Sequence, residues 1–175
     1  MLKKPVQDAI NDQINKELYS AYVYLSMSAY YEGVNLPGFA NWMRLQSSEE
    51  RGHAMRLYDF VLDRGGQVVL EAIGKPPSKF KSPMDVAQQT LEHEQRVTAM
   101  IEKLYEVALK EKDYATQTAL EWFITEQVEE EKNASGILEQ LKMVGDNRSA
   151  LLILDMELGK RRAESDGNSG QPQQP

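Results

Sequence analysis

The sequence contains no cysteine. This absence excludes disulfide bonds, thiolate zinc sites, cysteine-ligated iron–sulfur clusters and a cysteine nucleophile, so any metal must bind through oxygen and imidazole ligands. Positive charge is also scarce, because the 175 residues carry a formal net charge of −7 at pH 7. Such a chain lacks the basic face that a nucleic-acid partner requires and suits a protein that attracts cations. Its length predicts one domain with a buried core.

The sequence also lacks a long hydrophobic run. Its longest early stretch without a charged residue, 18–31, contains several serines and tyrosines and follows Asp8, Asp12 and Glu17. This composition predicts neither a signal-peptide core nor a membrane span. We therefore expect a soluble, cytoplasmic protein with no membrane partner.

Glycine and proline are rare inside four long segments and concentrated between them, which is typical of a helical protein. We expect long helices at 5–32, 38–64, 82–112 and 113–144, and a short fifth helix at 147–162. Ser82 and Asp113 are expected N-caps. The connection over 65–81 is long enough to travel the length of a bundle, whereas the others are short. The sequence thus predicts an all-α four-helix bundle, with one domain over 1–162 and a disordered tail over 163–175.

The predicted inner face of each long helix is mostly apolar but is interrupted by polar residues. The interruptions are Glu17, Glu50, His53, Glu94, Gln127 and Glu130. Ionised carboxylates are costly in an apolar interior, and no Lys or Arg lies on the same inner lines to neutralise them. A buried polar network without metal would leave this charge unbalanced, so two divalent cations are the better interpretation.

The polar residues also repeat along the chain. Glu17 and Glu50 are 33 residues apart, and so are Glu94 and Gln127. Each half supplies one carboxylate and then an i, i+3 pair on one helical face, which is the known arrangement of di-iron carboxylate bundles. Oxygen ligands with one imidazole suit Fe(II), Mn(II) or Zn(II) better than copper.

Five longer stretches extend this pattern: 17–22 (ELYSAY), 49–53 (EERGH), 93–94 (HE), 119–123 (ALEWF) and 126–132 (EQVEEEK). At these residues the sequence resembles the non-haem ferritins of bacteria and archaea, and the resemblance covers about residues 2–158. It implies that Glu17, Glu50 and His53 bind one iron, and that Glu50 bridges to a second iron held by Glu94 and Glu130. Gln127 would lie beside the pair, and Tyr24 would be a nearby redox-active or hydrogen-bonding tyrosine. The resemblance also implies a third iron position with the ligands Glu49, Glu126, Glu129 and the shared Glu130.

The activity that the resemblance implies is ferroxidase. Two Fe(II) ions would give electrons to O2 or peroxide and move as Fe(III) into a mineral core. Members of this family form hollow shells of 24 copies, in which the fifth helix lies near the symmetry axes. Its apolar residues, Leu151, Leu152, Leu154 and Leu158, would need such a partner.

Simpler interpretations apply to several single residues. Tyr24 could be a packing residue with its hydroxyl on a carboxylate, and Glu49, Glu126 and Glu129 could be solvated members of a charged stretch. His93 is expected to be structural or exposed, because its neighbour Glu94 points inward.

Four other interpretations fit the sequence less well. A haem-binding bacterioferritin would repeat Glu-x-x-His in the second half and would have methionine where Arg51 stands, so we expect no haem. A rubrerythrin-type peroxidase needs a cysteine-ligated iron. A di-iron oxygenase generally uses two Glu-x-x-His pairs, and the complete ligand set argues against a silent shell subunit.

Overall fold

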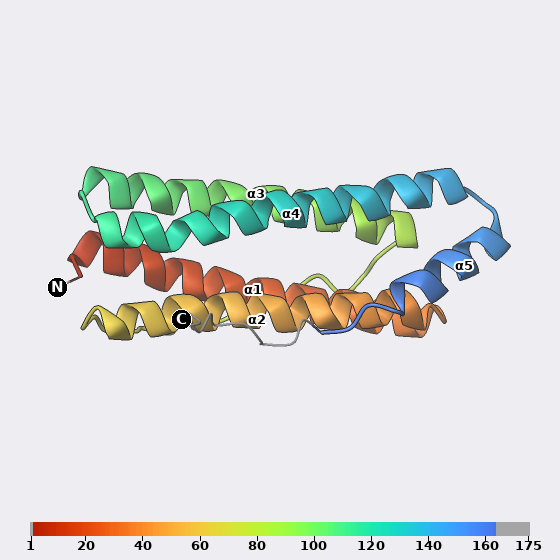
Figure 1. Cartoon of the computed structure of the whole chain (residues 1–175). Coiled ribbons are helices and arrows are strands. Elements are labelled where there is room, and N and C mark those ends of the chain that lie inside the picture. Colours follow the sequence, from red (N-terminus) through yellow and green to blue (C-terminus); the bar gives the residue numbers. More distant parts are fainter. Residues whose placement is uncertain (1, 164–175) are drawn as a thin grey trace, which may run out of the picture.

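Five helices form most of the computed structural model, which describes residues 2–163. They are α1 (Lys4–Gly33), α2 (Pro37–Asp63), α3 (Pro83–Lys110), α4 (Tyr114–Val144) and α5 (Arg148–Leu158). The first four lie side by side as a long bundle, and α5 packs across one end of it (Figure 1). This arrangement confirms the predicted all-α four-helix bundle. None of the helices in the described part of the chain is long and apolar enough to cross a membrane.

The helix ends follow local rules. The side chains of Ser82 and Asp113 accept hydrogen bonds from backbone N–H groups three residues later, at 3.1 Å each, which confirms both predicted N-caps. The third helix ends earlier than the predicted residue 112, because Lys112 adopts a left-handed backbone with a φ of 55°. The predicted fifth helix was also too long. It ends at Leu158, and short-range turn bonds follow it, so Arg161 lies outside the helix.

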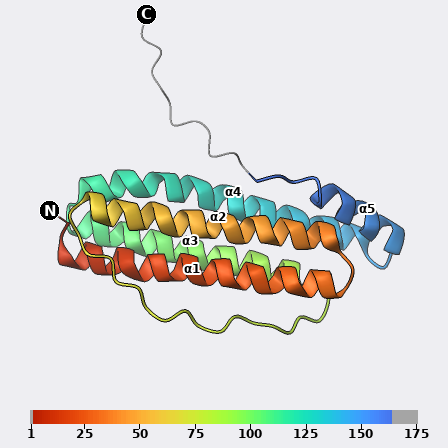
Figure 2. The ribbon, with the colours of Figure 1, turned by 90° about the horizontal axis from the view of Figure 1, so that it is seen from below.

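The long crossover, 64–82, runs along the outside of α1 (Figure 2). Polar side chains of α1 hold it in place and contact it in the same order as the chain runs. The hydrogen bonds to the crossover include Asn11 Nδ2 to Gln67 O (3.0 Å), Asn15 Nδ2 to Glu71 O (3.0 Å) and Ser26 Oγ to Pro77 O (2.6 Å), and Tyr31 Oη donates to the first residue of α3, Pro83 O (3.3 Å). The crossover therefore returns the chain to the far end of the bundle, as the sequence predicted.

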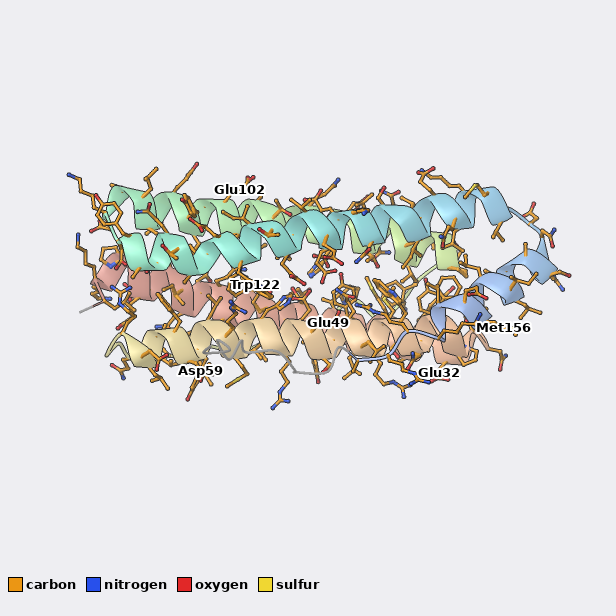
Figure 3. All side chains as sticks on the ribbon, in the orientation of Figure 1. Glu32, Glu49, Asp59, Glu102, Trp122 and Met156 are labelled. Atoms are coloured by element: carbon orange, nitrogen blue, oxygen red, sulfur yellow. The ribbon has the colours of Figure 1, made fainter. Side chains whose placement is uncertain are left out.

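The core consists of two apolar clusters separated by a polar layer. One cluster contains Ile10, Ile14, Leu57, Ile101, Leu120 and Phe123 among its buried members. The other contains Tyr24, Met27, Tyr31, Phe39, Met43, Ala87 and Leu141. On each of the four long helices, the predicted inner polar residues lie between the segments that form these two clusters. The side chains that fill the bundle are drawn in Figure 3.

Helix α5 is anchored closely to the start of α2. The backbone N–H of Phe39 donates to Asp155 Oδ1 at 2.9 Å, which places a carboxylate at the N-terminus of α2. Gly38 permits this approach, because a Cβ atom there would lie 1.7 Å from the carbonyl oxygen of Asp155. Leu154 of α5 is a buried member of the apolar cluster that contains Phe39, and Leu151 and Leu158 pack against that cluster. The predicted tail over 163–175 lies outside the described residues except for Ala163.

The Gly38 contact generates a stability prediction. We expect Gly38→Ala to lower the free energy of unfolding by about 1–3 kcal/mol, because α5 must move away from the new methyl group. Gly136→Ala is the matched control, since a Cβ at Gly136 of α4 meets no atom within 4 Å. It should be neutral or stabilise the protein by about 0.5–1 kcal/mol. Thermal unfolding of both variants measures the difference, and equal effects would contradict the close-packing explanation.

Candidate metal centre

The polar layer contains all six residues that the sequence predicted for the inner site. Each of the four long helices supplies at least one of them, and every one is buried: Glu17, Glu50, His53, Glu94, Gln127 and Glu130. On each helix, apolar residues recur at spacings of three and four and pack into the two clusters. The six polar residues lie on the same helical faces, so they also point inward. The interior that holds these carboxylates is therefore otherwise apolar.

Glu17, Glu50 and His53 form the first group that could hold a metal ion. Each offers one ligand atom, and the three atoms lie within 4.8 Å of one another. Glu50 and His53 lie one turn apart on α2, with 3.7 Å between Glu50 Oε2 and His53 Nδ1. This whole group comes from the α1–α2 pair, and its geometry agrees with the ligands expected for one iron.

A second group consists of His53, Glu126 and Glu130, whose ligand atoms also lie within 4.8 Å of one another. Glu126 was expected at a third metal position, but here its carboxylate lies beside the imidazole. Glu94 belongs to neither group. Its carboxylate accepts hydrogen bonds from the Tyr24 hydroxyl and, at 3.3 Å, from the Gln127 amide. Its use as a metal ligand stays a prediction.

Among residues 2–163, three buried carboxylate oxygens of this polar layer have no hydrogen-bond partner. They are Glu17 Oε2 and both side-chain oxygens of Glu50. The other oxygen of Glu17 accepts a hydrogen bond from Gln13 Nε2 at 2.8 Å. Buried polar atoms almost always have a partner, so these oxygens require a proton or a cation. The residues therefore fit a site for divalent metal ions.

Burial controls the protonation of the four inner carboxylates. It raises the pKa values of Glu50, Glu94 and Glu130 to about 8 each, and it raises the pKa of Glu17 well above its ordinary value. Neighbouring negative charges add to each rise, for example Glu50 acting on Glu17 and Glu94 acting on Glu130. Metal ions must therefore displace protons from these groups, and metal binding is expected to release protons.

A layer of polar residues surrounds the centre. Gln46 of α2, which has no role in the sequence-based prediction, is fully buried, and its amide donates to Glu130 Oε2 at 2.5 Å. His93 is buried and hydrogen-bonded to Ser20 Oγ at 2.8 Å, and burial lowers its pKa to about 4. Its ring also packs edge-on against that of Tyr24, with 5.8 Å between centroids. This environment agrees with the structural role expected of His93.

The residues expected at the third metal position do not form one group. Glu126 is partly buried beside His53, whereas Glu129 is exposed on α4. Glu49 lies near the middle of α2 (Figure 3), and its Oε2 accepts a hydrogen bond from Arg161 at 2.7 Å. No local pattern in the sequence predicts this contact, because Arg161 is 112 residues away and outside every predicted inner face.

Known proteins share both the sequence and the fold. A family model described as a ferritin-like domain matches residues 7–144. A bacterial non-heme ferritin of Bacteroides fragilis is 41% identical over 161 residues, which cover 92% of this chain and 100% of that protein. A bacterial non-heme ferritin of Staphylococcus aureus is 38% identical over 161 residues, covering 92% of this chain and 97% of that protein.

Solved structures show the same relationship. One is a novel open pore ferritin from the hyperthermophilic archaeon Archaeoglobus fulgidus, with a TM-score of 0.92, 48% identity, and coverage of 93% of this chain and 100% of that one. Another is a closed form of the Archaeoglobus fulgidus ferritin engineered by site-directed mutagenesis. It has a TM-score of 0.93, 47% identity, and coverage of 94% of this chain and 100% of that one.

The raised pKa values predict how pH affects the metal-free protein. Between about pH 4.5 and about pH 8 the unfolded chain loses protons that folded Glu50 retains, so stability should fall as pH rises through this window. Each proton that only the folded state retains lowers the free energy of unfolding by up to about 1.4 kcal/mol per pH unit. Glu50→Gln, which cannot ionise, should flatten the slope, whereas the exposed Glu106→Gln should not. Denaturant unfolding after chelation measures this, and an unchanged slope in Glu50→Gln would contradict the assignment.

Proposed function

This chain belongs to the ferritin family, and we propose that it oxidises Fe(II) at a buried dinuclear centre and stores the Fe(III) as mineral inside a shell of its own copies. The observation that carries the proposal is the unpartnered carboxylate of Glu50, buried between Glu17 and His53. We assign residues 1–162 to one ferritin-like domain. The protein is proposed to act in the cytoplasm, without nucleic-acid or membrane partners.

The proposed ligands follow the two halves of the bundle. Glu17, Glu50 and His53 hold one Fe(II), and their mutual proximity supports this assignment. Glu50 bridges to a second Fe(II) held by Glu130 and Glu94. Each Glu94 oxygen accepts one hydrogen bond, from Tyr24 or from Gln127, and keeps a second lone pair with which it can bind the metal. Gln127 then lies beside the pair as a neutral amide.

The chemistry requires balanced electrons and protons. Two Fe(II) ions lose one electron each, and O2 takes both electrons with two protons to give H2O2. Peroxide used as the oxidant instead would take two electrons and two protons to give water. Carboxyl groups with raised pKa values release protons when metal binds, so protons are available beside the irons. Tyr24, hydrogen-bonded to Glu94, is positioned to orient that carboxylate and is our candidate for a redox-active side chain.

The asymmetry of the two halves favours transfer of iron over its retention. The second half presents Gln127 and Glu130 where a symmetric di-iron enzyme has Glu and His. A neutral amide is a weaker ligand for iron than a carboxylate or an imidazole, so the second position should hold iron less firmly. We propose that iron leaves through a third position at Glu126 and the shared Glu130, which Glu49 and Glu129 complete by turning toward the metal when it binds.

The outward face of α5 supports assembly with further copies. Leu152, Ile153 and Met156 are 56%, 62% and 68% exposed, and they lie on a short helix whose other side packs on the bundle. A cluster of exposed apolar side chains of this kind marks an interaction surface. We propose that neighbouring copies cover it in a homo-oligomeric shell of 24 subunits.

Iron oxidation tests the function directly. The protein is loaded with Fe(II) without oxygen and then exposed to air, and we expect a fast oxidation phase that is absent from buffer. Glu50→Ala and His53→Ala should slow this phase by about 10- to 100-fold or more, since loss of an outer-shell partner alone costs that much in other metal sites. Glu106→Ala, which removes an exposed carboxylate of α3, should oxidise iron normally. Oxidation at the buffer rate by the unmodified protein would refute the proposal.

Shell formation is tested separately at α5. Ile153→Lys should produce small oligomers, because a charge on the outward face must be desolvated in a subunit contact. Ile153→Val keeps the face apolar and should assemble normally. Light scattering gives the size, and circular dichroism checks that helix content is preserved. A full-sized shell of Ile153→Lys would show that this face is not an assembly surface.

A further inference from the structure

The segment that follows α5 is fixed to the side of α2. Asn41 Nδ2 of α2 donates a hydrogen bond to the backbone oxygen of Arg161 at 3.2 Å. The Arg161 guanidinium lies over the ring of Trp42, with 4.7 Å between its Cζ atom and the ring centroid. Backbone and side chain are thus both held, so the position of this guanidinium is well defined.

The guanidinium makes two further contacts that point toward the metal centre. It donates to Glu49 Oε2 at 2.7 Å and to Gln46 Oε1 at 2.8 Å. The amide nitrogen of Gln46 in turn donates to Glu130 Oε2 at 2.5 Å. A chain of hydrogen bonds therefore runs from the segment after α5 through the fully buried Gln46 to a proposed iron ligand.

The ion pair between Arg161 and Glu49 is partly buried. Their side chains are only 25% and 23% exposed, so solvent screens the pair less than it screens an exposed one. Arginine keeps its charge at any relevant pH, so this contact does not switch off by deprotonation. Only another cation or movement of the segment can free the Glu49 carboxylate from it.

We propose that Arg161 is a tethered cation that competes with a metal ion for Glu49, so that a metal in the third position displaces the segment after α5. The inference rests on the proposed function, which makes Glu49 a ligand of that position. A metal dication bound to Glu49 would lie within a few ångströms of the guanidinium, and the two positive charges repel. Metal binding at Glu49 and docking of Arg161 therefore oppose each other, and by linkage each weakens the other equally.

Zn(II) binding measured by calorimetry tests the competition without iron oxidation. We expect Arg161→Gln to bind the third Zn(II) per subunit on the order of tenfold more tightly than the unmodified shell, with the first two unchanged. Lys160→Gln is the matched control, because it removes the same charge one residue away, where the exposed Lys160 pairs with Glu157 of its own turn and with no other residue in the described part of the chain. Adding Glu49→Gln to Arg161→Gln should abolish the gain.

A second measurement uses the unmodified shell alone. Hydrogen exchange of the backbone amides of residues 160 and 161, which donate to carbonyls at the end of α5, should accelerate when the third Zn(II) binds but not when the first two do. This measurement decides the question even when Arg161→Gln does not assemble.

The outcomes separate the two proposals. An unchanged third affinity in Arg161→Gln, or exchange that does not respond to the third Zn(II), overturns the inference while the dinuclear centre stands. A weaker third affinity also overturns it, since Arg161 would then position Glu49 for the metal. Failure of the unmodified shell to bind the first two Zn(II) ions refutes the dinuclear centre and this inference with it.

Discussion

The structure depends on four carboxylates held in an apolar interior. Removing Glu17, Glu50, Glu94 and Glu130 from water raises their pKa values, and no described residue donates a hydrogen bond to the oxygens of Glu50. The bundle tolerates this layer because apolar clusters on both sides provide the burial that drives folding. The same desolvation that weakens the metal-free protein strengthens its attraction for a dication, since proton and metal compete for the same oxygens.

The two halves of the bundle repeat in sequence but differ in how their carboxylates are satisfied. In the first half, Glu17 and Glu50 keep unpartnered oxygens beside His53. In the second half, Glu94 accepts from Tyr24 and Gln127, and Glu130 accepts from Gln46. The hydrogen bonds orient the carboxylates of the second half before any metal binds, whereas Glu50 in the first half has none from the described residues. This difference would make the two proposed iron positions unequal.

Much of the fold was predictable because it follows local rules. Ser82 and Asp113 cap their helices through contacts only three residues long, and the inner face of each helix is set by its own periodicity. The contacts that escaped prediction join distant segments. Arg161 reaches Glu49 across 112 residues, and Gln46 reaches Glu130 across 84, so no local pattern reports either pair. The grouping of Glu126 with His53 depends likewise on the relative rotation of α2 and α4, which spacing along one helix does not specify.

Glu17, Glu50 and His53 all come from one helical hairpin, α1 and α2, and this has a consequence for the order of folding. Contacts between α1 and α2 are close in sequence, so this pair can form early, whereas α3 joins it only after the long crossover has been laid along α1. Glu17, Glu50 and His53 are all in place once α1 and α2 pair. If this pair forms first, the hairpin would already present the three proposed ligands before the second half docks, and a bound dication would neutralise charges that the docking of α3 and α4 must bury.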